Sequence, residues 1–203
     1  MKHSIIFVLT MLCLTIQAEA MEIKFGFYYD NEIVGLEKDL FSAKDRIEKL
    51  LNIQLKIDYR KRLPFNLPVL EYYNKPGVEL EYLFRIIEQQ KLSMNGSDFV
   101  FILTDKILWD LRLKDNKLSR YFPVDGYADI DNKKHALLRY KSNMGVDYLH
   151  LLLMHEWGHL LGLGHRDDIC GNGVNFIMCS RHGLGRIMVE TSYRNAVQNF
   201  LQK

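Results

Sequence analysis

The hydrophobic and polar residues of this chain alternate with two different periods, which predict strands and helices. Residues 22–29 and 55–59 alternate apolar with polar side chains, as expected of half-buried strands. Residues 36–51 place apolar side chains at helical spacing, which predicts an amphipathic helix. The continuous apolar run at 98–104 predicts a central strand that is covered on both faces.

Later segments continue the same pattern, apart from a region around three prolines. The region 64–76 predicts a loop. Further strands are predicted at 126–130 and 135–140, and further helices at 78–90, 146–161 and 188–201. The order strand, helix, strand, helix, strand predicts right-handed crossovers and a mixed twisted sheet. The expected fold class is therefore α/β (α+β).

Length and composition are those of an ordinary globular protein. The chain has 203 residues, of which 48% are hydrophobic and 26% are charged. This is enough for one well-cored domain. The formal net charge of +2 is too small to favour a nucleic acid or an anionic surface as partner. We therefore expect no nucleic-acid binding.

The first 20 residues have the three parts of a secretory signal peptide. A basic start is followed by an apolar run at 5–14 and by an A-x-A cleavage site that ends at Ala20. A membrane anchor is the alternative, but the run is short for a spanning helix. A lipoprotein signal at Cys13 fits poorly, because no small residues flank it. We expect cleavage after Ala20, a secreted or periplasmic domain at 21–203, and no stable membrane insertion afterwards.

One stretch, at 155–165, specifies chemistry, because it has the pattern HExxHxxGxxH. His155 and His159 are four residues apart, so a helix places both imidazoles on one face. This spacing suits two nitrogen ligands on a single zinc ion. Glu156 projects beside the same face, where a glutamate commonly acts as general base toward the metal-activated water.

The end of the pattern supplies a third nitrogen. Gly162 can take a positive φ angle and end the helix in a left-handed turn. The chain then doubles back, so that His165 can reach the same ion. Three histidines leave one coordination position open, which is the arrangement of a catalytic zinc site. One catalytic Zn²⁺ is therefore the expected cofactor. The alternatives are that these are ordinary helix residues, or that the chain binds zinc without catalysis.

The motif resembles that of the metzincin clan of zinc endopeptidases, in which a methionine turn lies beneath the metal. Met178 is the candidate for that methionine. The flanking Cys170 and Cys179 are similar to the loop of adamalysin-type (reprolysin-like) members. Those proteins have aspartate after the third histidine, whereas this chain has Arg166, so we assign no subfamily. The resemblance implies a metzincin-like fold with an N-terminal subdomain at 21–162 and a small irregular C-terminal subdomain at 163–203.

The two cysteines outside the signal peptide predict one disulfide, since an exported chain meets an oxidising environment. A Cys170–Cys179 bond would hold the segment after His165 in fixed relation to the methionine turn. Two free thiols, or zinc ligation by these cysteines, are the alternatives. Met178 itself would form a hydrophobic floor and would not bind the metal.

The resemblance also implies where a substrate binds. In metzincin-like proteins a strand at the rim of the cleft runs antiparallel to the sheet, and its exposed edge pairs with an extended peptide. We expect this role for four consecutive residues, Tyr127, Ala128, Asp129 and Ile130. The segment 180–187 is expected to wall the specificity pocket.

Together these features predict a zinc-dependent endopeptidase that acts as a monomer on peptide or protein substrates. One alternative is a secreted zinc-binding module of the same fold without catalysis, although the presence of Glu156 argues against it. The other is a zinc hydrolase that acts on a non-peptide amide.

Overall fold

The computed structural model describes residues 22–30, 35–67, 69–72, 74–89, 96–114, 117–170, 174–179 and 186–203. The predicted signal peptide lies outside these residues, as does most of the expected specificity wall, 180–185. Within the described ranges, no helix combines the length and the apolar character needed to cross a membrane.

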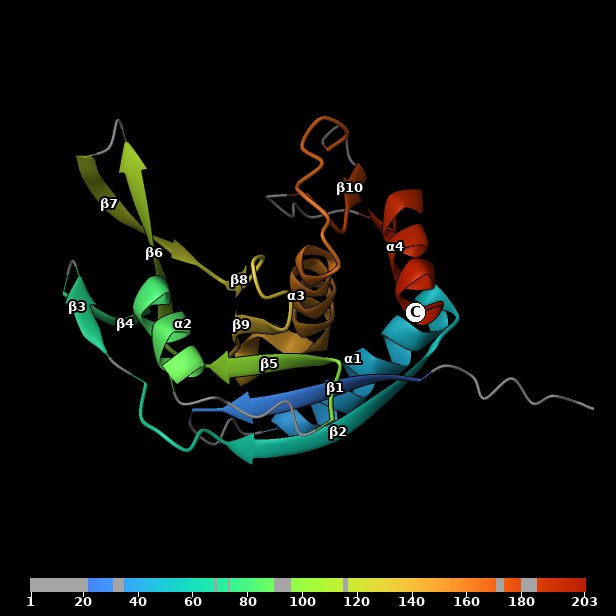
Figure 1. Cartoon of the computed structure of the whole chain (residues 1–203), viewed down its shortest axis with the longest axis horizontal. Helices are drawn as coiled ribbons and strands as arrows, with labels where there is room; N and C mark the ends of the chain where they lie inside the picture. Colours follow the sequence, from blue (N-terminus) through green and yellow to red (C-terminus); the bar gives the residue numbers. More distant parts are fainter. Residues whose placement is uncertain are drawn as a thin grey trace, which may run out of the picture.

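A five-stranded mixed sheet forms the base of the fold (Figure 1). In sheet order its strands are β2 (Gln54–Arg62), β1 (Glu22–Tyr29), β5 (Phe99–Thr104), β9 (His135–Arg139) and β8 (Gly126–Ala128). Neighbouring strands are parallel except at the last pair, where β8 runs antiparallel to β9. The prediction of a mixed α/β sheet is thus confirmed, and the strand expected at 126–130 is shorter, because a turn begins after Ala128.

In the described part of the chain, four α-helices cover the two faces of this sheet. They are α1 (Leu36–Leu51), α2 (Leu80–Gln89), α3 (Gly145–Leu160) and α4 (Thr191–Leu201), and a short 3-10 turn, η1 (Ser142–Met144), leads into α3. Phe99, Phe101 and Leu103 of β5 belong to the core that includes α1, α3 and α4. The intervening Val100 and Ile102 belong to the core that includes α2. All six residues of β5 are buried, so the prediction of a doubly covered strand is confirmed.

The residues described also form two smaller sheets. One has the order β3 (Leu70–Tyr72), β4 (Lys75–Glu79), β6 (Ile107–Lys114) and β7 (Lys117–Val124), and the other pairs β10 (Val174–Phe176) with β11 (Arg186–Met188). The expected loop at 64–76 was therefore wrong in part, because it contains β3 and the start of β4. Asn74, with φ 54°, makes the turn between these two strands.

Two helices begin later than their apolar spacing predicts. Helix α2 starts at Leu80 because the preceding Val78 and Glu79 pair with β6. The Glu79 carboxyl group then accepts hydrogen bonds from the N–H groups of Glu81 and Tyr82, at 2.9 and 3.0 Å, and so satisfies the first turn. Helix α4 starts at Thr191, and not at 188, because Met188 pairs with β10.

An aromatic cluster fixes the position of α3. Trp157 is fully buried, and its ring lies 5.1 Å from that of Phe25 on the sheet and 5.9 Å from that of Tyr193 on α4. The Tyr193 hydroxyl donates a 2.7 Å hydrogen bond to the carbonyl of Met154. Edge-to-face ring contacts of this kind add about 0.5–1.5 kcal/mol each to the burial of the rings. The helix that carries the zinc motif is therefore held from both sides.

Candidate metal centre

The three histidines of the motif converge on one point. His155 and His159 come from the last turns of α3, and Gly162, with φ 90°, reverses the chain after the helix. His165 then returns toward the helix, and the three Nε2 atoms form a triangle in which every side measures 3.2 Å. The three ligand atoms lie close enough together to hold one metal ion.

The size of this triangle fits zinc. Zn–N bonds of about 2.0–2.1 Å at tetrahedral angles separate neighbouring nitrogens by about 3.3–3.4 Å. The observed 3.2 Å agrees closely with that separation. Three imidazoles at such a distance, with their Nε2 atoms facing one another, leave one face of the triangle free for a fourth ligand.

Hydrogen bonds at the other ring nitrogens orient two of these histidines. His155 Nδ1 donates to the carbonyl of Ile177 at 2.7 Å, and His159 Nδ1 donates to the carbonyl of Leu163 at 2.8 Å. Each bond puts the ring proton on Nδ1 and leaves the Nε2 lone pair for a metal. Burial also lowers the pKa of His159, which favours the neutral ring that a metal requires.

The Glu156 carboxyl group lies in the same region and is buried, with 4% of its surface exposed. Burial raises the pKa of Glu156 to about 8, because the charged form loses its hydration. Within the described residues its Oε2 atom has no hydrogen-bond partner. A buried carboxyl oxygen without a partner is costly, and it is a common feature of groups that react with a bound molecule.

The edge strand β8 lies directly against this carboxyl group. A Cβ atom added at Gly126 would fall 2.7 Å from Glu156 Cδ and 2.8 Å from Cγ, so only glycine allows the approach. The strand is anchored by the preceding Asp125, which accepts hydrogen bonds from the Tyr148 hydroxyl at 2.5 Å and from Arg139 Nη1 at 3.1 Å. These contacts tie β8 to both α3 and β9.

A cleft of about 600 Å³ runs between the histidines and β8. Of the expected substrate-binding residues, Tyr127, Ala128 and Ile130 line it, whereas Asp129 lines a neighbouring cavity of about 320 Å³. Asp129 also accepts a 3.1 Å hydrogen bond from the N–H of Asn132, within the turn that follows β8. The strand order ends at β8, so its outer edge has no strand partner in the described part of the chain.

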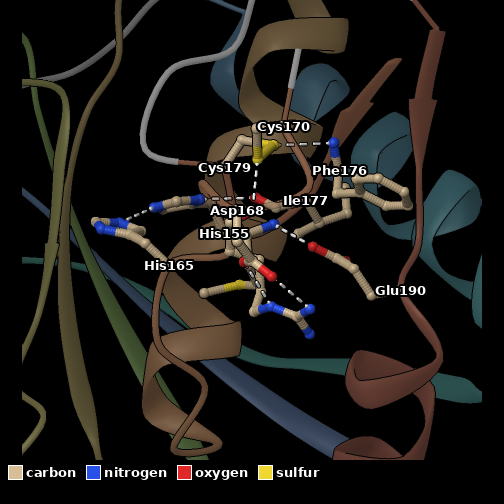
Figure 2. Close-up of a disulfide and its surroundings, with 10 residues drawn as sticks. His155, His165, Asp168, Cys170, Phe176, Ile177, Cys179 and Glu190 are labelled. Atoms are coloured by element: carbon tan, nitrogen blue, oxygen red, sulfur yellow. Dashed lines mark hydrogen bonds and ion pairs between the residues drawn. A yellow bond between two sulfur atoms is a disulfide. The ribbon is translucent and has the colours of Figure 1, made fainter. Parts of the chain in front are cut away.

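The methionine turn lies next to His155: Figure 2 shows His155 between His165 and Ile177 of this turn. Met178 is fully buried and directly follows the residue whose carbonyl binds His155. A disulfide joins Cys170 to Cys179 and connects the segment after the third histidine to this turn. The two thiols are thus paired with each other and are not metal ligands.

Several residues that contact the site lie outside the HExxHxxGxxH motif and were not predicted from the sequence. Gly126, Asp125 and Tyr148 act through contacts between segments that are distant in the sequence. Glu190, next to α4, accepts a hydrogen bond from the N–H of Met178 at 2.8 Å. A glycine before an alternating segment and a lone glutamate before a helix are common in any sequence, so neither predicts these contacts.

His150 lies on α3 outside the triangle, and burial together with the charge of Arg46 lowers its pKa to about 4. In the unfolded chain the His150 ring binds a proton near pH 6.5. The contribution of His150 to the stability of the fold is therefore complete above pH 6.5 and is lost as the pH falls toward 4. We expect the zinc-free protein to lose about 1–2 kcal/mol in this range through His150, after allowance for partial exposure. Urea unfolding at pH 7 and 4.5 should show that His150→Gln loses less unfolding free energy between these two pH values than the wild type does. Equal losses would contradict the prediction.

Comparisons with known proteins show which solved structures have a similar fold. No protein-family model and no curated protein matches the sequence. Among solved structures, an archaemetzincin from Methanopyrus kandleri is similar with a TM-score of 0.64 and 18% identity, over 90% of this chain and 97% of that chain. A zinc-dependent peptidase from Methanocorpusculum labreanum has a TM-score of 0.53 and 16% identity, over 85% and 99% of the two chains.

A third structure, an archaemetzincin from Archaeoglobus fulgidus complexed with malonate, has a TM-score of 0.53 and 15% identity, over 86% of this chain and 99% of that one. The likeness to an adamalysin-type loop stays a prediction. The similarity extends over most of each chain, so this protein has an archaemetzincin-like, metzincin-type fold.

Proposed function

We propose that this protein is a zinc-dependent peptidase that hydrolyses peptide bonds with Glu156 as general base. One observation carries the proposal. Three histidines, two of them oriented by hydrogen bonds, present their Nε2 atoms to one point at zinc-like spacing, and a buried carboxyl group lies beside them in an open cleft. The similarity in fold to archaemetzincins, and to a structure described as a zinc-dependent peptidase, supports the same reading.

Each part of the cleft would contribute one function. His155, His159 and His165 would hold the zinc ion, which when bound supplies Lewis acidity for the attack on a peptide carbonyl. Glu156 would accept the proton of the attacking water and then pass it to the leaving amine.

The unpaired edge of β8 would bind the substrate main chain. An extended peptide can add to such an edge as a further strand, which aligns a peptide bond with the metal at the opposite wall of the cleft. Endopeptidase activity, in preference to removal of terminal residues, is part of the proposal, because the cleft lies along a strand edge.

Metal removal tests the proposal directly. We expect the purified protein to contain about one zinc ion per chain and to cleave an unfolded protein substrate. A chelator should abolish cleavage, and added zinc should restore it, because the three histidines hold the metal reversibly. Metal analysis and gel-based cleavage on the same sample provide the measurement.

The other outcomes separate the alternatives. Zinc without cleavage of any peptide would favour a non-catalytic zinc-binding module. Chelator-sensitive hydrolysis of small amides without cleavage of peptides would favour a different zinc hydrolase. A protein that binds no zinc would exclude the proposed function altogether.

A further inference from the structure

A single peptide bond lies between one ligand of the metal centre and a buried carboxyl group. The peptide that joins Ile177 to Met178 accepts the Nδ1 proton of His155 at its carbonyl oxygen, at 2.7 Å. The N–H of the same peptide donates to Glu190 Oε1, at 2.8 Å. Figure 2 shows His155 and Glu190 approaching this turn from opposite sides.

Glu190 is placed as a group with a specific task. It is 5% exposed, and its second oxygen, Oε2, has no hydrogen-bond partner among the residues described. A buried carboxyl group with an unsatisfied oxygen costs stability, and an apolar residue of similar volume would avoid that cost. Its other oxygen, Oε1, makes a hydrogen bond to the turn that orients His155.

The same turn also reaches the third histidine. The carbonyl of Met178 accepts a 2.9 Å hydrogen bond from the N–H of Arg166, which directly follows His165. Fixing this turn therefore fixes the partner of one ligand and the backbone next to another. His159, by contrast, depends on the local carbonyl of Leu163.

We infer that Glu190 is a positioning residue of the metal centre, which acts on His155 through the Ile177–Met178 peptide. A hydrogen bond at the peptide N–H polarises the carbonyl at its other end. The carbonyl then accepts the Nδ1 proton of His155 more strongly, which holds the ring in place and makes Nε2 a better donor to zinc. The inference rests on the proposed zinc site and extends it to a residue outside the motif.

Zinc affinity, measured by competition with a chelating dye, tests this role. We expect Glu190→Ala to weaken zinc binding by about 10–100-fold, as is typical when the partner of a metal-binding histidine is lost. Glu190→Gln keeps an acceptor oxygen and should lose less. Wild-type affinity in Glu190→Ala would overturn the inference.

Glu48 offers a matched control. Its Oε1 atom accepts the N–H of Leu55 at the same 2.8 Å, between α1 and the edge strand β2 at the opposite end of the sheet from β8. Glu48→Ala should remove this hydrogen bond and the ion pair of Glu48 with Lys44, and so destabilise the fold, but leave zinc affinity within about two-fold. Equal losses of zinc affinity in Glu48→Ala and Glu190→Ala would reduce Glu190 to a general stabilising residue and overturn the inference.

A second measurement serves if Glu190→Ala does not fold. In the zinc-loaded protein, proton NMR of the ring N–H groups reports the His155 and His159 hydrogen bonds separately. Glu190→Gln should shift the His155 Nδ1 proton upfield and leave that of His159 unchanged. No shift, or equal shifts at both rings, would overturn the inference. Absence of zinc from the wild-type protein would instead refute the zinc site itself, so the two failures are distinguishable.

Discussion

Replacing Glu156 by glutamine is expected to lower kcat/KM for peptide hydrolysis by about 10²–10⁴-fold while the zinc content stays unchanged. Glutamine has the shape of glutamate but cannot accept the proton of the attacking water. The zinc content should persist because the proposed ligand atoms belong to the three histidines. Loss of zinc along with activity would contradict a role confined to proton transfer.

Stability provides the control for this variant. The pKa of Glu156 is raised by burial, so its contribution to stability is complete below its ordinary pKa and is lost as the pH rises toward 8 in the metal-free protein. Glutamine stays neutral and avoids this loss. Metal-free Glu156→Gln should therefore unfold at a temperature no lower than the wild type at pH 7, as thermal denaturation can show. A lower unfolding temperature would point to a structural cause for the lost activity.

Gly126→Ala is expected to lower kcat/KM by about 100-fold or more, although residue 126 bears no reactive group. The added Cβ would lie 2.7 Å from Glu156 Cδ, so the carboxyl group or strand β8 must move. Either movement changes the distance between the base and the peptide bond that it serves. A displacement of about 1 Å at a reacting group is enough for a loss of this size.

Gly164→Ala is the matched control for that variant. Gly164 lines the same cleft, but a Cβ atom there would meet nothing within 4 Å. Kinetic assays of both alanine variants, with zinc analysis of each, should show a large loss for Gly126→Ala and a change of less than about two-fold for Gly164→Ala. Equal activity of the two variants would show that β8 does not position Glu156.

The features that the sequence predicts well are local ones. His155 and His159 depend only on helical spacing, and the return of His165 depends on a turn that Gly162 can make. The doubly covered strand at 98–104 was predicted because its unbroken apolar run needs no knowledge of its neighbours. In each case the residues that decide the structure lie within one or two turns of one another.

The features that the sequence does not predict depend on distant partners. Strands β3 and β4 are short, and β4 contains Pro76. Strand β3 is stabilised by pairing with β4, which in turn pairs with β6. Gly126 matters only because Glu156 approaches it across the sheet edge, and Glu190 only because the methionine turn folds back on it. The hairpin of β6 and β7 could have been found, since apolar and polar residues alternate from Trp109 to Lys114 and the turn-forming pair Asp115–Asn116 follows.

The Cys170–Cys179 bond makes the chemistry of the surroundings part of the stability of this region. The two cysteines are nine residues apart, and closing a loop of that length removes about 2–3 kcal/mol of chain entropy from the unfolded state. Under reducing conditions that contribution disappears from the segment that carries His165, while His155 and His159 remain on α3. Reduction of the disulfide would therefore leave two histidines rigidly placed on α3 and the third, His165, loosely held. Metal retention would then depend on the redox potential of the compartment.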